Sequence, residues 1–121
     1  WNLNAVEGRG MFIKHHRYAH VDIRMYNSEE ENHQNYIRWN FPDENIQKGI
    51  DYKTGIETSL IFFTKYLSGL RGKQVYLTFE ITDASYHPVD TRGSYDYEIA
   101  TLYAIFSCFN KQFFKLVKNC G

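Results

Sequence analysis

The chain has 121 residues, of which 43% are hydrophobic and 17% aromatic, so we expect a single domain over residues 1–121 with enough apolar material for a core. Lysine and arginine together number 14, as do aspartate and glutamate, which excludes a binder that relies on bulk charge to hold nucleic acid or a membrane surface. With two cysteines and no long apolar run, the sequence favours a cytoplasmic protein without a disulfide framework or membrane contact.

The start of the chain predicts a β-hairpin. Gly8-Arg9-Gly10 is typical of a turn, so the first strand is expected over Met11–Ile13. Tyr18–Tyr26 alternates apolar and polar residues, which predicts a second strand. His15-His16-Arg17 then forms the turn between the two strands.

A third strand and a long helix follow. Tyr36–Phe41 alternates again, and the strand ends at Pro42 because proline cannot donate to a strand ladder. Pro42 also suits the first turn of a helix, which is expected to end at Ser68–Gly72. Within it, Gly49 and Gly55 are predicted to allow close packing or to mark a kink. Its apolar stripe is formed by Ile46, Ile50, Ile56, Leu60, Phe63 and Leu67.

The segment Val75–Thr91 combines a strand with a projecting loop. Val75–Ile81 alternates strictly, which predicts a central strand, and the pattern breaks at Asp83. Because Pro88 ends the strand, His87 is expected at the tip of the loop. Arg92-Gly93-Ser94 then offers an N-cap for a second helix. Its expected stripe contains Ile99, Leu102, Phe106, Phe109, Phe113 and Leu116, and its last turns carry Lys111, Lys115 and Lys118.

These elements predict an α+β fold. The order β-β-β-α-β-α, with one apolar face per strand and one stripe per helix, favours a two-layer sandwich of a four-stranded sheet with both helices on one face. The side chains expected to be buried together are Val21, Ile23, Trp39, Leu77, Phe79, Leu102, Phe106 and Phe109.

Several segments resemble a known family. They are YAHVDIRM (Tyr18–Met25), FPDENIQKGI, GLRG (Gly69–Gly72) and, most specifically, DASYHPVDT (Asp83–Thr91). They resemble domain IV of translation elongation factor G and related translational GTPases, including the tetracycline-resistance ribosomal protection proteins. The resemblance covers roughly residues 8–107 and implies a ribosomal-protein-S5-domain-2-like fold with a left-handed β-α-β crossover, against the usual hand.

The resemblance also implies a function. In that family the domain is a non-catalytic arm whose tip loops enter the ribosomal decoding centre, so the expected partner is the ribosome or tRNA. Histidine and tyrosine can stack on bases or donate to phosphates. The nucleic-acid-binding residues expected here are Ser85, Tyr86, His87, Arg92, His15, His16 and Arg17. The family's glycine-rich loop is replaced by His15-His16-Arg17, and no GxxxxGK[ST] motif is present, so no bound nucleotide or other cofactor is expected.

Two chemical alternatives are weaker. His15, His16, His20 and Asp22 include the ligand types of a metal site, but neighbours on a strand point to opposite faces, so at most His20 and Asp22 converge with a loop histidine. We therefore predict no metal site. An enzyme built on His87 lacks a second acid-base partner, so no catalytic residue is predicted, and Cys108 is expected to be a buried hydrophobe.

The alternative function is protein association through the open face of the sheet, with a second copy or a neighbouring domain as the partner. Interfaces are enriched in tyrosine and arginine. The interface residues expected on this face are Tyr18, Arg24, Tyr36, Arg38 and Tyr76. An ordinary solvated sheet face is the competing interpretation.

Overall fold

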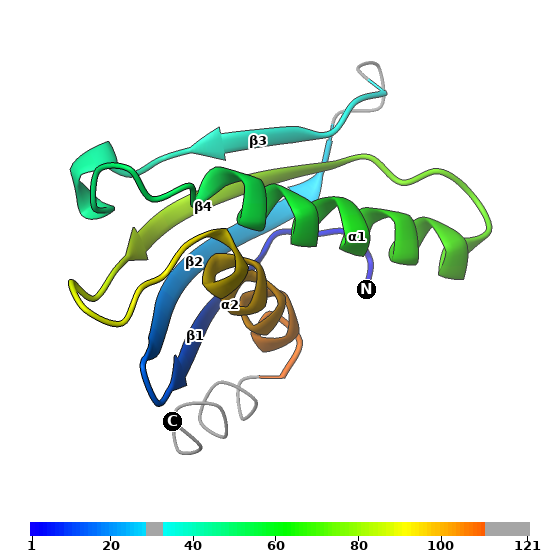
Figure 1. Ribbon diagram of the computed structural model, residues 1–121. Coiled ribbons are helices and arrows are strands. Elements are labelled where there is room, and N and C mark those ends of the chain that lie inside the picture. The colour runs from blue at the N-terminus through cyan, green and yellow to red at the C-terminus, as the bar shows by residue number, and fades with distance from the viewer. Residues whose placement is uncertain (29–32, 111–121) are drawn as a thin grey trace.

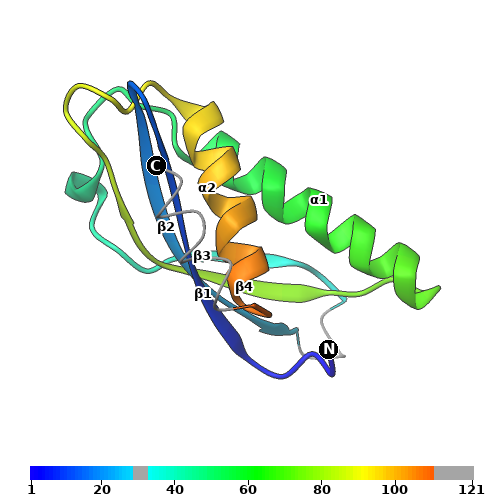
Figure 2. The same ribbon diagram turned by 90° about the horizontal axis from the view of Figure 1, so that it is seen from below.

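A four-stranded mixed sheet carries two helices on one of its faces (Figures 1 and 2). The computed structural model describes residues 1–28 and 33–110. The elements are β1 (Val6–Lys14), β2 (Arg17–Asn27), β3 (Tyr36–Trp39), the 3-10 helix η1 (Asp43–Asn45), α1 (Lys53–Arg71), β4 (Leu77–Ser85) and α2 (Ser94–Ser107). The predicted α+β class and the order β-β-β-α-β-α are confirmed.

The strands lie in the order β1-β2-β4-β3. β2 pairs antiparallel with β1 and with β4, whereas β3 pairs parallel with β4 at the edge of the sheet. In Figure 1, α1 lies in front of the sheet, β3 and β4 both point left, and β3 lies above β4. The β3-α1-β4 connection is therefore left-handed, which is rare among parallel crossovers.

The two central strands supply the core as their alternation predicts. Ala19, Val21, Ile23 and Met25 of β2 are fully buried against the helices, and so are Leu77, Phe79 and Ile81 of β4. The intervening residues of both strands point to the open face, because successive side chains of a strand alternate.

The prediction for the start of the chain is wrong in one respect. Gly8 and Gly10 lie inside β1, which begins at Val6, and they do not form a turn. A Cβ at Gly8 would overlap the carbonyl oxygen of Ala104, and one at Gly10 would overlap that of Ala100. The glycines thus let α2 approach the backbone of β1, which any larger residue would prevent.

The predicted apolar stripe of α2 is also wrong. The buried face consists of Tyr97, Ala100, Thr101, Ala104 and Ile105, together with Asp96 and Ser107. Leu102 is half-buried, and Phe106 and Phe109 are 51% and 50% exposed. Ala100 and Ala104 lie against Gly10 and Gly8 of β1, where the close contact leaves no room for phenylalanine. Phe113, Leu116, Lys111, Lys115 and Lys118 lie outside the described residues.

The helix predicted from Pro42 begins later. Only η1 follows Pro42, and α1 starts at Lys53. Gly49 has a φ of 92° and lies in the connection, and Asp51 Oδ1 accepts a hydrogen bond of 3.1 Å from the Thr54 amide at the new helix start. Gly55 packs against the backbone of Ser94, as the close-packing prediction requires.

Among residues 1–28 and 33–110, the structure contains no helix with the length and apolar character needed to cross a membrane.

Candidate nucleic-acid interface

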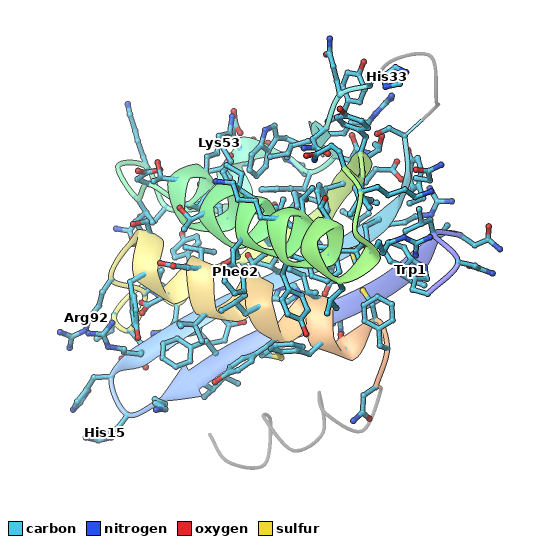
Figure 3. All side chains as sticks on the ribbon, turned by 90° about the vertical axis from the view of Figure 1, so that its right-hand side faces the viewer. Trp1, His15, His33, Lys53, Phe62 and Arg92 are labelled. Carbon is cyan, nitrogen blue, oxygen red and sulfur yellow. The ribbon has the colours of Figure 1, made fainter. Side chains whose placement is uncertain are left out.

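The two predicted tip loops lie at the same end of the sheet. The hairpin turn His15-His16 joins β1 to β2, and residues 86–93 join β4 to α2. Arg92 Nε donates a hydrogen bond of 2.9 Å to the carbonyl oxygen of His16, so the loops are linked directly. Figure 3 shows the labelled His15 and Arg92 side by side at this end. The fold therefore brings together residues that are more than seventy positions apart in the chain.

His87 shapes its own loop and also faces solvent. Its Nδ1 accepts hydrogen bonds of 3.1 Å from the backbone amides of Val89 and Asp90, while 49% of the side chain is exposed. An Nδ1 atom that accepts these bonds carries no proton, so neutral His87 carries its proton on Nε2. His87 can thus order the loop with one nitrogen and present a donor with the other.

Thr91 fastens this loop to the sheet, a role that the sequence did not reveal. Its Oγ1 accepts a hydrogen bond of 2.7 Å from the amide of His87 and donates one of 2.8 Å to the carbonyl oxygen of Tyr18. The Thr91 amide also donates to the His87 carbonyl oxygen over 3.1 Å. The loop is therefore held at both ends, and its tip is positioned by β2.

Asp96 is the second residue that sequence reasoning missed. Its side chain is completely buried in the first turn of α2. It accepts a hydrogen bond of 3.0 Å from Arg17 Nη1 and one of 2.9 Å from the Arg92 amide. The signal that could have found it is an acidic residue near the positive end of a helix. Because Arg17 is paired with Asp96, its charge is partly used within the fold and is less available for phosphate.

The remaining predicted tip residues differ in position. His15, His16 and Arg92 are exposed, and Tyr86 is partly buried. Ser85, in contrast, is the last residue of β4, and its hydroxyl contacts Tyr18 and His20 on the open sheet face. The structure thus brings together both loops but turns Ser85 away from their tip.

The predicted sheet-face residues share one surface. Arg24 pairs with Glu80 at 2.7 Å and stacks over the Tyr26 ring at 4.8 Å, whereas Arg38 is exposed. Arg38 lies on β3, an edge strand, so the interface residues do not all lie at the centre of the sheet. The partly buried residues on this face are Tyr18, Tyr36 and Tyr76.

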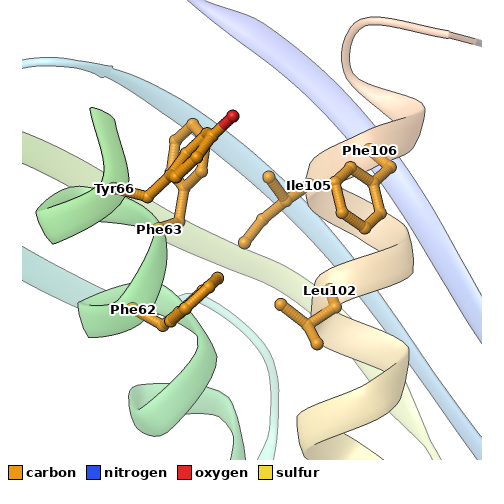
Figure 4. Close-up of a pocket in the computed structure, with 6 residues that line it drawn as sticks. All are labelled: Phe62, Phe63, Tyr66, Leu102, Ile105 and Phe106. Carbon is orange, nitrogen blue, oxygen red and sulfur yellow. The ribbon is translucent and has the colours of Figure 1, made fainter. Parts of the chain in front are cut away.

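A separate apolar groove lies between the outer faces of α1 and α2 (Figure 4). It has a volume of about 260 Å³. Its lining residues are Phe62, Phe63, Tyr66, Leu102, Ile105 and Phe106. Phe63 and Phe106, predicted on the apolar stripes of the two helices, thus line a groove on the helical surface.

Comparison with known proteins identifies a fold but no family. No family model matches the chain, and no curated protein matches it. Among solved structures, the crystal structure of ttk003000868 from Thermus thermophilus is similar to this chain, with a TM-score of 0.60 and 21% sequence identity. The match covers 84% of this chain and 15% of that one, so the same fold occurs there within a much longer protein.

Proposed function

We propose that this chain is a non-catalytic module, similar to domain IV of elongation factor G, which contacts the ribosome or tRNA through its tip loops. The observation that carries the proposal is the hydrogen bond from Arg92 Nε to the His16 carbonyl oxygen. It joins the two loops into one surface, so a single RNA could touch both. The module works either within a larger translational factor or alone.

The side chains at this end suit RNA. His15, His16 and His87 offer rings for stacking and donors for phosphate, and Tyr86 directly precedes His87 in the chain. Lys14 and Arg92 are the exposed cations. Two phosphate contacts predict weak binding by the isolated domain with a modest salt dependence, because each contact contributes roughly 0.7–0.9 to the slope of log K against log salt. Attachment to a larger factor would raise the effective concentration.

The test replaces both exposed cations of the tip. We expect the Lys14→Glu/Arg92→Glu variant to lose most of its association with ribosomes or tRNA at low salt, as measured by ribosome pelleting and by tRNA fluorescence anisotropy. The matched control is Lys65→Glu/Lys73→Glu, which changes the net charge equally at exposed positions of α1 and the loop after it. Equal loss in both variants, or no binding by the wild type at low salt, contradicts the proposal.

Self-association through the open sheet face is the second candidate, and a row of charges favours it. Backbone pairing places Glu7 opposite Arg24, Arg24 opposite Glu80, and Glu80 opposite Arg38. The charges of these side chains therefore alternate between negative and positive across all four strands. A second copy related by a twofold axis between β2 and β4 would place Glu7 over Arg38 and Arg24 over Glu80, so every facing pair would have opposite charges.

A further inference from the structure

A group of metal-ligand side chains meets on the open face of the sheet, away from the tip. His20 and Asp22 lie two residues apart on β2, and Asp83 lies opposite Asp22 on β4. One potential ligand atom from each residue lies within 4.8 Å of the other two. His20 is 8% exposed, and Asp22 and Asp83 are partly buried. The three residues thus form a recessed cluster.

A change of register in β4 places the third residue. Asp22 pairs with Asp83, but Ile23 pairs with Ile81, so Thr82 is an extra residue in β4. This bulge shifts the alternation, so that Ala84 faces the core and Asp83 faces the same side as Asp22. The loop histidines predicted as possible third ligands, His15 and His16, remain at the hairpin turn.

Two of the three residues, His20 and Asp83, are oriented by contacts from outside the cluster. His20 Nδ1 lies 2.8 Å from Ser85 Oγ, which lies 3.0 Å from Tyr18 Oη, so Nε2 is directed toward Asp22 Oδ1 at 2.9 Å. Asp83 Oδ1 accepts hydrogen bonds of 3.0 Å from Asn45 Nδ2 and 2.9 Å from the Ala84 amide.

Such outer contacts are typical of metal ligands, since they fix the ring and carboxylate orientations that an ion requires. The ligand set is therefore a histidine whose second nitrogen is held by the Ser85 hydroxyl, the Asp83 carboxylate held by Asn45 and the Ala84 amide, and the neighbouring Asp22 carboxylate.

In this structure, Arg9 offsets part of the negative charge of the cluster. Its Nε and Nη2 donate to Asp22 Oδ1 and Oδ2 over 2.7 and 2.9 Å. The two carboxylates carry two negative charges, of which the Arg9 guanidinium offsets one. Because 55% of the Arg9 side chain is exposed, compared with 10% for His20 and 16% for Asp22, Arg9 can leave while the ligands stay in place.

We propose that His20 Nε2, Asp22 and Asp83 bind a divalent transition-metal ion of the zinc type, which displaces Arg9 from Asp22. An imidazole with two carboxylates suits such ions, and three protein ligands leave the fourth position to water. With ligand bonds of about 2.0–2.1 Å, neighbouring donors of a tetrahedral ion lie about 3.4 Å apart, so a small closure of the cluster is sufficient.

The proton of His20 is accounted for within the cluster. An Nε2 atom that binds the ion carries no proton, so a neutral His20 ring in the bound state carries its proton on Nδ1. Nδ1 then donates to Ser85 Oγ, and the Ser85 hydroxyl can turn to donate to Tyr18 Oη, since either oxygen of that pair can be the donor. Binding of the ion to a neutral ring therefore releases no proton from His20.

Calorimetric titration of the full chain with Zn²⁺ tests this site. We expect one saturable ion per chain at this cluster and a higher melting temperature with Zn²⁺, since an ion that binds only the folded state stabilises it. Asp83→Asn should weaken binding at least tenfold. Arg9→Gln should tighten it severalfold, because it removes the competing cation.

The controls separate this cluster from other ligands. Glu80→Gln removes an acid from the same face, and His15→Ala/His16→Ala removes the hairpin imidazoles; both should bind Zn²⁺ like the wild type. His20→Ala should also lose Zn²⁺ binding. If His20→Ala fails to fold, the binding measured for Asp83→Asn decides whether the cluster holds the ion. No saturable binding by the wild type, or unchanged binding in Asp83→Asn, overturns the proposal and leaves an internal ion-pair network.

Discussion

At the scale of single residues, the pairing of Arg17 with Asp96 makes a sharp stability prediction. The Asp96 side chain is fully buried, whereas 40% of the Arg17 side chain is exposed. Arg17→Met would leave a buried carboxylate with the Arg92 amide as its one remaining donor among the described residues, so we expect a cost of about 2–4 kcal/mol. Asp96→Asn leaves an arginine that water can reach and should cost about 1–2 kcal/mol.

Urea unfolding of both single variants and of the double variant measures this coupling. The double variant should be less destabilised than the sum of the singles by about 1 kcal/mol, because the unpaired carboxylate is absent from it. Arg38→Met, at an exposed position of β3, is the control and should stay within about 0.5 kcal/mol of the wild type. Additive costs would show that the two side chains act independently.

The same scale shows what sequence could predict about the sites. His87 follows from local chemistry, since Pro88 shortly after the strand places it in a loop. Asp83 as a neighbour of Asp22 does not, because it depends on which strands pair and on the extra residue Thr82. Asp96 and Thr91 likewise act through contacts with β2 and its hairpin turn, which no local pattern encodes.

At the scale of elements, replacing a glycine by alanine is expected to lower the stability of the fold at one position, in β1, and to raise it at another, in α1. Gly10→Ala should destabilise the fold by several kcal/mol or prevent folding, because its Cβ would overlap the backbone of α2 at Ala100. Gly69→Ala, in the last turn of α1, meets open space and should raise stability by up to about 1 kcal/mol.

Thermal and chemical unfolding, followed by circular dichroism, can compare the two variants directly. A Gly10→Ala variant as stable as the wild type would show that α2 does not rest on the backbone of β1. Gly69→Ala controls for the general effect of adding a methyl group.

The packing of each element explains why hydrophobic periodicity predicted the buried face of the strands but not that of α2. The strands β2 and β4 are packed on one face only, so alternation predicted Val21, Ile23, Leu77 and Phe79 correctly. For α2, two faces are apolar: one of small residues toward β1 and one with Phe106 beside the groove. A stripe of large residues is usually the buried one. Here the close helix-strand contact selects the small face instead.

At the scale of the whole molecule, the helical layer and the sheet face are two distinct surfaces. The helical layer exposes several large apolar side chains, among them Ile61, Phe62, Tyr66 and Phe106. The open face of the sheet is crossed instead by the charged row Glu7, Arg24, Glu80 and Arg38. A chain with equal numbers of acidic and basic residues is not kept apart from a second copy by net charge. Association by the sheet face therefore depends on the order of charges within the row.

That order gives the last prediction, a loss of self-association that a second charge change restores. Arg38→Glu should weaken dimerisation, measured by sedimentation velocity at high concentration, because its carboxylate would face Glu7 of a twofold-related copy and lie beside Glu80 of its own chain. Adding Glu7→Arg to this variant returns opposite charges to the facing pair and should restore much of the association. Phe62→Ser, on the helical layer, should have no effect. A wild type that stays monomeric at high concentration, or a double variant that associates no better than Arg38→Glu, would exclude the charge row as the contact between copies.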